Sequence, residues 1–288
     1  MYLKVTCKGD DKKHIVEFLK GGEFEVSGKV YELGDKGSQE GKILQEINIR
    51  LAGFGGGVPD EDFTKRTEKI VKQFQKDYMK ITPTGKVDAA TLNSIDKFSD
   101  KWSEQISDYK CLCHSTPFVV AKANRCPGYG KGKSKEHPGI HRNILWSISA
   151  LKFYLSEQTT YTYWKTSAGY RCKAHNLAKG RTSTNHMGKA IDIQYYENGT
   201  KITGKKQSNL TPLKAIRDDF YIKHLDAVSG WTGKKNHYRI EPIGIGKDQS
   251  YSWIHMDVSK YETKFLEDKF FVKEQNLIKG KSLNELHK

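Results

Sequence analysis

Two short stretches set the expected architecture: Thr-Ser-Thr-Asn-His-Met-Gly-Lys-Ala-Ile-Asp-Ile at residues 182–193 and Trp-Ile-His-Met-Asp-Val at residues 253–258. In the first stretch apolar and polar residues alternate, which predicts a β-strand with Asp192 on one face and its two neighbouring isoleucines facing a core. The second stretch alternates in the same way, so His255 and Asp257 share one face. Both stretches therefore predict strands that offer polar side chains to one cleft.

Three side chains in these stretches are candidate metal ligands. A zinc ion in a hydrolase binds three protein ligands, drawn from His, Asp, Glu and Cys, and keeps one position open for water. Asp192 and His255 lie on the predicted strands, and His186 precedes the turn at Gly188, from which it can reach the same ion. One histidine alone is more often structural, but two stretches that each pair a His with a carboxylate favour a shared site. We predict that His186, Asp192 and His255 bind Zn²⁺.

The second half of the chain has the pattern of an α+β domain. Apolar residues recur at helical spacing between residues 139 and 157, which predicts an amphipathic helix that packs on a sheet. Strands are expected at residues 161–167, 190–194 and 253–258. We therefore expect one α+β domain with a small antiparallel sheet from residue 99 to residue 288.

The first third of the chain divides into two parts, because 288 residues exceed one typical domain. Residues 1–32 alternate in short pieces between turn signals and predict a small β-hairpin or meander. Apolar residues at helical spacing then predict three helices over residues 33–98. Their markers are Leu44-Gln45, a glycine loop at 53–57, Phe63, Thr67, Phe74-Gln75, Gly-Lys-Val-Asp at 85–88 and Thr91-Leu92. This order resembles the small three-helix peptidoglycan-binding domain; an unrelated three-helix bundle is the alternative.

The charge of the chain is compatible with several partners. Lys and Arg number 49 against 34 Asp and Glu, which gives a net charge of +15 and an attraction to polyanions. Nucleic acid, an anionic membrane and an anionic cell wall all meet that description. No motif that reads RNA or DNA occurs, and no apolar run approaches the roughly 18 residues of a membrane span. We expect no nucleic-acid partner and no stable membrane insertion.

The cysteines allow two interpretations. Their number, five, is odd, so a framework of disulfides is not expected. Cys111 and Cys113 are too close in sequence to bridge each other readily, but they could hold a second, structural metal with Cys126 and either His114 or Cys172. Buried free thiols are the alternative, and the one that the sequence favours.

Four features occur in the order found in one enzyme family. They are Ala-Gly-Tyr-Arg at residues 168–171, His-Asn at 175–176, the His-Met-Gly-Lys-Ala-Ile-Asp run at 186–192 and the Trp-Ile-His-Met-Asp-Val run. The order resembles that of the M15 zinc peptidases, which include D-alanyl-D-alanine carboxypeptidases and endolysins. With a peptidoglycan-binding module in front, the chain resembles a modular bacteriophage endolysin.

One turn departs from the family pattern, which usually reads Ser-x-His-x-x-Gly-x-Ala-x-Asp. Here Thr184 replaces the Ser, and only one residue separates His186 from Gly188. An alignment on the glycine would place Asn185 at the His position. Asn is a poor zinc ligand, so we retain His186 and expect a turn that is one residue shorter.

The resemblance also implies catalytic residues. Relatives carry an acid or a His shortly before the last ligand, where this chain has Ser252 and Trp253. Asp257 is the remaining candidate for the general base, or else a residue that orients His255. Arg171 would hold a substrate carboxylate or the oxyanion of the tetrahedral intermediate, with a surface salt bridge as the alternative.

The expected function is a monomeric zinc peptidase that cuts an amide bond in the stem peptide or cross-bridge of bacterial peptidoglycan and so lyses the cell. D-Ala-D-Ala trimming uses the same chemistry, but an endolysin must weaken the mesh, so we favour an endopeptidase. A catalytically inactive wall-binding protein and a glycoside hydrolase are the alternatives. The N-terminus has no apolar run of signal-peptide length, so we expect synthesis in the host cytoplasm and action on the cell wall.

Overall fold

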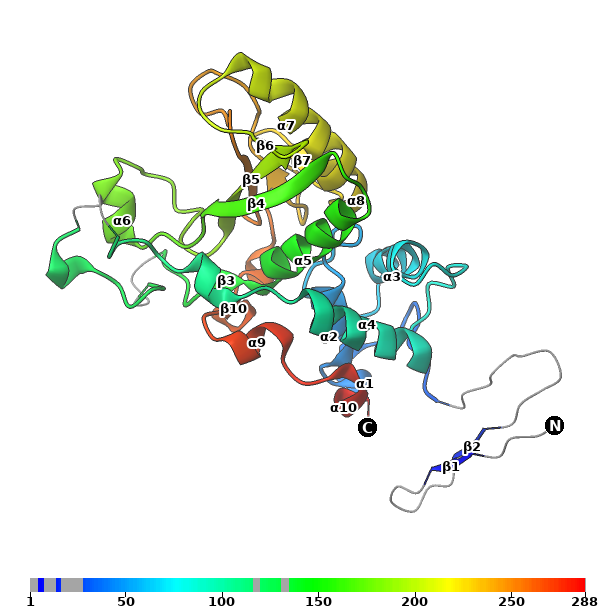
Figure 1. The fold of residues 1–288 in the computed structure, drawn as a ribbon. Coiled ribbons are helices and arrows are strands. Elements are labelled where there is room, and N and C mark those ends of the chain that lie inside the picture. Colours follow the sequence, from blue (N-terminus) through cyan, green and yellow to red (C-terminus); the bar gives the residue numbers. More distant parts are fainter. Residues whose placement is uncertain (1–4, 8–13, 17–27, 116–119, 131–134, 288) are drawn as a thin grey trace.

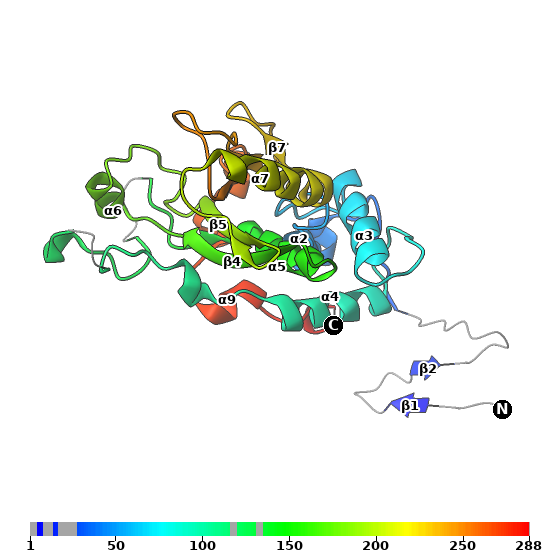
Figure 2. The same ribbon diagram turned by 45° about the horizontal axis from the view of Figure 1, so that its top comes forward.

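The computed structural model describes residues 5–7, 14–16, 28–115, 120–130 and 135–287. Helices and sheets are mixed, as the α+β prediction requires. Figure 1 shows helices α2, α3 and α4 gathered on one side, the strands β4 and β5 on the other, and α5 between them. The short helix α6 lies at the end of the molecule opposite to α3, in this view and in the turned view of Figure 2.

The N-terminal segment contains a short antiparallel hairpin. Strand β1 (Val5–Cys7) pairs with β2 (His14–Val16), which agrees with the predicted small hairpin. The part of the predicted hairpin or meander between residues 17 and 27 lies outside the described residues. Residue Tyr31 then forms an isolated bridge with Val87 and so joins the segment before the helices to the segment between them.

The three predicted helices are present between residues 43 and 102. They are α2 (Ile43–Arg50), α3 (Lys65–Asp77) and α4 (Ala89–Trp102), preceded by the short α1 (Gly37–Glu40). Thr64 caps α3 by accepting a hydrogen bond from the Thr67 backbone, and Asp88 caps α4 through the Thr91 backbone. Side-chain oxygens at these positions satisfy amide groups that a helix start leaves unpaired.

The main sheet has six strands in the order β4-β5-β9-β8-β7, with β6 beside β5. All neighbours are antiparallel except β7 and β8. Its strands are β4 (Tyr161–Ala168), β5 (Ala190–Glu197), β6 (Thr200–Lys201), β7 (Val228–Ser229), β8 (Arg239–Ile240) and β9 (Ile254–Asp257). The three strands predicted from alternation are therefore confirmed as β4, β5 and β9.

Helices connect and cover this sheet. The helix predicted between residues 139 and 157 is α5 (Arg142–Ser156), which contacts α2, α4 and β4. It is not amphipathic as expected, because 13 of its 15 residues are buried between the helical region and the sheet. The others in this part are α6 (Lys173–Ala178), α7 (Leu210–Ile216), a π-helical turn (Arg217–Ile222) and α8 (Lys223–Leu225). A second, two-stranded sheet joins β3 (Ile140–His141) to β10 (Phe271–Val272). Within the described residues, no helix has the length and apolar character needed to cross a membrane.

Helix α5 joins the helical region and the sheet region in one hydrophobic core. A side chain at Gly53 would come within 2.3 Å of the Cβ of Ala150 on α5, so only glycine allows this close approach. The ring of Phe54 lies 6.0 Å from that of Phe153 and 5.6 Å from that of Tyr154. The three-helix region thus packs directly against the rest of the chain.

The C-terminal segment returns to the three-helix region with α9 (Gln275–Lys279) and α10 (Leu283–Leu286). The fully buried guanidinium of Arg50 contacts Asp96 at 2.8 Å and donates to the backbone carbonyl of Lys281. Asp96 in turn accepts from the Leu283 backbone at 2.9 Å. Burial would raise the pKa of Asp96, but hydrogen bonds from residues 282–284 and the charge of Arg50 lower it. This network fastens the end of the chain to α2 and α4.

Candidate metal and substrate site

The register between β5 and β9 brings two predicted ligands together. Asp192 on β5 pairs directly with His255 on β9, and Nδ1 of His255 lies 2.7 Å from Oδ1 of Asp192. Directly opposed residues on one face of an antiparallel pair have neighbouring side chains. The alternation that the sequence showed in both stretches therefore produces this contact.

His186 reaches the same point from the turn before β5. Gly188 has a φ of +116°, and a Cβ there would lie 2.5 Å from the Gly139 carbonyl, so the short turn requires glycine. Nδ1 of His186 lies 3.0 Å from the Gly169 carbonyl and must carry the proton in that contact. Nε2 is therefore left with its lone pair, and it lies 3.3 Å from Oδ1 of Asp192. A His whose other nitrogen donates to a carbonyl has the arrangement typical of a metal ligand.

The geometry of His186, Asp192 and His255 fits one small ion. One donor atom from each lies within 4.8 Å of the others. Ligands about 2.1 Å from a tetrahedral centre are about 3.4 Å apart, close to the separation of Nε2 of His186 from Asp192. Burial raises the pKa of Asp192, but both histidines lower it much further, so this carboxylate is charged. The group can hold a metal ion.

Asp257 lies behind His255. Its side chain is fully buried, and its Oδ2 lies 3.1 Å from Nε2 of His255. The same oxygen accepts from Nη2 of Arg239 at 2.7 Å and from Nε at 3.0 Å. Burial favours a raised pKa for Asp257, but His255 and Arg239 together hold it well below its usual range. Asp257 therefore lies against the ring of His255, as the second of the two roles that the sequence left open requires.

A cavity of about 700 Å³ opens in front of the three candidate ligands. Glu241, which follows β8, lines this cavity together with Trp231 and Trp253. The backbone amide of Glu241 donates to the His255 carbonyl at 3.2 Å, which holds the residue beside the site. The pKa of Glu241 is raised, chiefly by burial. The negative charge of Asp192 also raises it, whereas the positive charge of His255 and a hydrogen bond with Trp253 lower it. Glu241 is thus a carboxylate at the cavity wall that the sequence did not suggest.

Arg171 also lines the cavity. Its backbone amide donates to the His186 carbonyl at 2.8 Å, so the two segments run side by side. Its guanidinium lies 3.8 Å from Asp192, and among the described residues its buried Nε has no hydrogen-bond partner. A buried cationic donor without a partner fits a site for a carboxylate or an oxyanion better than a surface salt bridge.

Four cysteines form a separate cluster. Cys111, Cys113, Cys126 and Cys172 are all buried, and their sulfur atoms lie within 4.8 Å of one another. Nε2 of His114, one of the two candidate fourth ligands, instead lies 2.7 Å from the Cys126 carbonyl. The structure therefore gathers the three predicted thiols with Cys172.

Comparison with known proteins identifies one part of the chain. Residues 40–95 match a family described as a putative peptidoglycan binding domain. The match covers α2, α3 and the first half of α4. It supports the peptidoglycan-binding module predicted over residues 33–98, with peptidoglycan as the partner. No curated protein matches the chain.

Proposed function

We propose that this protein is a zinc peptidase of the M15 type that hydrolyses an amide bond in the peptides of bacterial peptidoglycan, as a phage endolysin does. The observation that carries the proposal is the convergence of His186, Asp192 and His255 on one wall of a 700 Å³ cavity. The peptidoglycan-binding match in the same chain indicates the polymer on which such a site would act. The basic surface, with a net charge of +15, suits an anionic wall.

His186, Asp192 and His255 are the residues that would hold the ion. Zinc in such a site supplies Lewis-acid activation of a water molecule and of the scissile carbonyl. The proton on Nδ1 of His186 and the contact of His255 with Asp257 fix both rings. The ligand atoms are therefore oriented before substrate binds, which reduces the reorganisation that the reaction requires.

We assign Glu241 as the general base and Asp257 as a positioning residue. Glu241 lies on the cavity wall, whereas Asp257 is enclosed by His255 and Arg239. A base must reach the water whose proton it accepts and the leaving amine to which it delivers that proton. Burial raises the pKa of Glu241, which makes its carboxylate a stronger base than an exposed one.

Arg171 would bind the oxygen that becomes negative during attack, or a carboxylate of the stem peptide. Its Nε, which has no hydrogen-bond partner within the described part of the chain, and its position on the cavity wall support either contact. Arg181 lines the same cavity and adds a second positive charge for the acidic stem peptides. An endopeptidase remains our preferred form of the activity, because cutting within the peptide mesh weakens the wall.

Mass spectrometry of fragments released from purified peptidoglycan tests this proposal. The full chain should release peptides with new amino and carboxyl termini, lose activity with a chelator and regain it with zinc. The matched control is Asp192→Asn, which should still sediment with peptidoglycan but release no peptide. Release of reducing sugar ends without peptide cleavage, or zinc-loaded protein that binds the wall without cutting it, would overturn the proposal.

A further inference from the structure

The four clustered cysteines come from three separate segments of the chain. Cys111 and Cys113 follow a 3-10 helix (Ile106–Tyr109), Cys126 follows another (Lys122–Asn124), and Cys172 caps the start of α6. Their exposed fractions are 5%, 0%, 4% and 2%, and none forms a disulfide. Four of the five cysteines of the chain therefore meet at one buried point.

The spacing of the sulfur atoms suits a tetrahedral metal site. Sulfur atoms about 2.3 Å from a central zinc ion lie about 3.8 Å apart. Sγ of Cys113 lies 3.7 Å from Sγ of Cys126, whereas the two atoms of a disulfide are about 2.05 Å apart. The other two sulfurs belong to the same group within 4.8 Å.

Hydrogen-bond donors surround the cluster. The backbone amide of Cys172 donates to Sγ of Cys111 at 3.3 Å, and the amide of His175 donates to Sγ of Cys172 at 3.4 Å. Nδ1 of His175 also lies 3.3 Å from Sγ of Cys111. Such donors stabilise thiolates, but several buried thiolates repel each other unless a cation lies between them.

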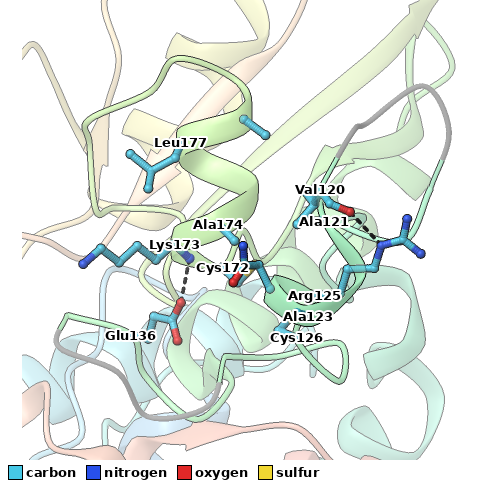
Figure 3. Close-up of a pocket in the computed structure, with 12 residues that line it drawn as sticks. Val120, Ala121, Ala123, Arg125, Cys126, Glu136, Cys172, Lys173, Ala174 and Leu177 are labelled. Atoms are coloured by element: carbon cyan, nitrogen blue, oxygen red, sulfur yellow. Dashed lines mark hydrogen bonds between the residues drawn. The ribbon is translucent and has the colours of Figure 1, made fainter.

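The surrounding chain needs a cross-link of this kind. The described parts of residues 103–137 contain two short 3-10 helices and no strand. The segment at 120–126 and α6 both line a cavity of about 400 Å³, and Figure 3 shows Cys126 and Cys172 beside it. A loop-rich region with few regular elements gains most from a metal that joins its segments. Cys172 directly follows Arg171, and Leu112 lies between Cys111 and Cys113; both Arg171 and Leu112 line the 700 Å³ cavity, so the cluster is adjacent in the chain to residues of that wall.

We propose that Cys111, Cys113, Cys126 and Cys172 bind a second zinc ion in a closed tetrathiolate site. Thiolates select zinc over harder cations such as magnesium and calcium, and four protein ligands leave no position for water. The ion is structural: it joins the 103–130 segment to α6 and holds Arg171 at the cavity wall. In this proposal the four thiols are metal ligands, whereas the sequence favoured free buried thiols.

Metal content of the wild-type full chain gives the first test, and it does not depend on peptidase activity. Elemental analysis of protein purified under reducing conditions should find two zinc ions per chain. Asp192→Asn should retain one, and titration of that variant with an organomercurial reagent should release it after about four thiols have reacted. Iron in place of zinc, or a variant without metal whose cysteines alkylate freely, would overturn the proposal.

Cysteine variants give the second test. Cys113→Ser and Cys172→Ser should each lower the zinc content from two to one per chain. Cys7→Ser is the matched control, because Cys7 lies outside the three segments, and it should keep two. Cobalt replaces zinc as a probe if either variant folds poorly: wild-type protein loaded with Co²⁺ should show a thiolate-to-cobalt charge-transfer band, and an absent band would overturn the proposal. A Cys113–Cys126 disulfide in freshly reduced protein would do the same.

Discussion

The His186, Asp192 and His255 group and the four-cysteine cluster differ in three respects. The first borders a 700 Å³ cavity and offers three ligands, whereas the second offers four thiols that are at most 5% exposed. Two residues of the first group lie on paired strands and the third lies in the turn before β5, whereas the second group joins loops and one short helix. In zinc proteins three ligands with an open position accompany catalysis, and four closed ligands accompany folding. The position of a group in the fold therefore indicates what an ion bound there would do.

The largest effect on activity is expected at Asp192, the carboxylate that contacts both histidines. Asp192→Asn should lower peptide release by about 10⁴-fold, because a site that loses its charged ligand loses several kcal/mol of metal-dependent stabilisation. Peptide release and binding to peptidoglycan should be measured on the same preparation. Retention of more than a tenth of the activity would show that the ion sits elsewhere.

Glu241→Gln tests whether the group formed by His186, Asp192 and His255 is a catalytic site with Glu241 as its general base. The substitution should lower kcat by roughly 10³-fold with little change in KM, because general-base catalysis contributes roughly 10²–10⁴-fold. The zinc content should not change, since Glu241 is not among the three ligands. Steady-state kinetics with a synthetic stem peptide gives this split. A kcat equal to that of the wild-type protein would mean that another residue is the general base.

Cys113→Ser tests whether the four-cysteine cluster holds a structural ion, because loss of a ligand should destabilise the folded protein. Removing one ligand should lower the free energy of unfolding by about 3 kcal/mol, or the melting temperature by roughly 6–12 °C. Calorimetry of the reduced proteins, with Cys7→Ser as the control, measures the difference. Equal melting temperatures for the two variants would count against a structural ion.

Asp257→Asn gives the smallest expected effect and separates positioning from catalysis. Loss of a carboxylate that fixes a ligand ring lowers metal affinity by about 10–100-fold. Activity should therefore fall at limiting zinc and largely return when zinc is in excess. Zinc titration followed by activity shows the recovery, while Glu241→Gln should show none. Activity that zinc cannot restore would instead make Asp257 the base.

Much of the first group was predictable from sequence because alternation on β5 and β9 fixes side-chain direction. Asp192 and His255 were expected on one cleft, and the strand register places them in contact. The same reasoning put Asp257 on the face of His255, but it could not show that Arg239, opposite Asp257 in the sheet, donates to the carboxylate oxygen that also contacts His255. Local patterns do not report a partner that comes from another strand.

Glu241 and Cys172 were harder to assign for the same reason. Glu241 follows a strand of two residues, too short to show alternation, and it belongs to neither motif. Cys172 was one of two alternatives for the cluster, and only the fold shows that His114 turns its ring toward the Cys126 carbonyl. In the helical region the helix starts carry a local signal, because the cap residues Thr64 and Asp88 lie three residues before the backbone amides that they bind.

The fastening of the C-terminus to α2 and α4 has a consequence for protein engineering. A peptidoglycan-binding module that is joined to its enzyme only by a linker can be exchanged between enzymes. Here, excision of residues 40–95 would uncover Ala150 on α5, and loss of residues 281–284 would leave the charge of Arg50 buried with fewer partners. Removing one partner from a buried charge network is costly, so a useful chimera of this protein would carry its C-terminal segment together with the module.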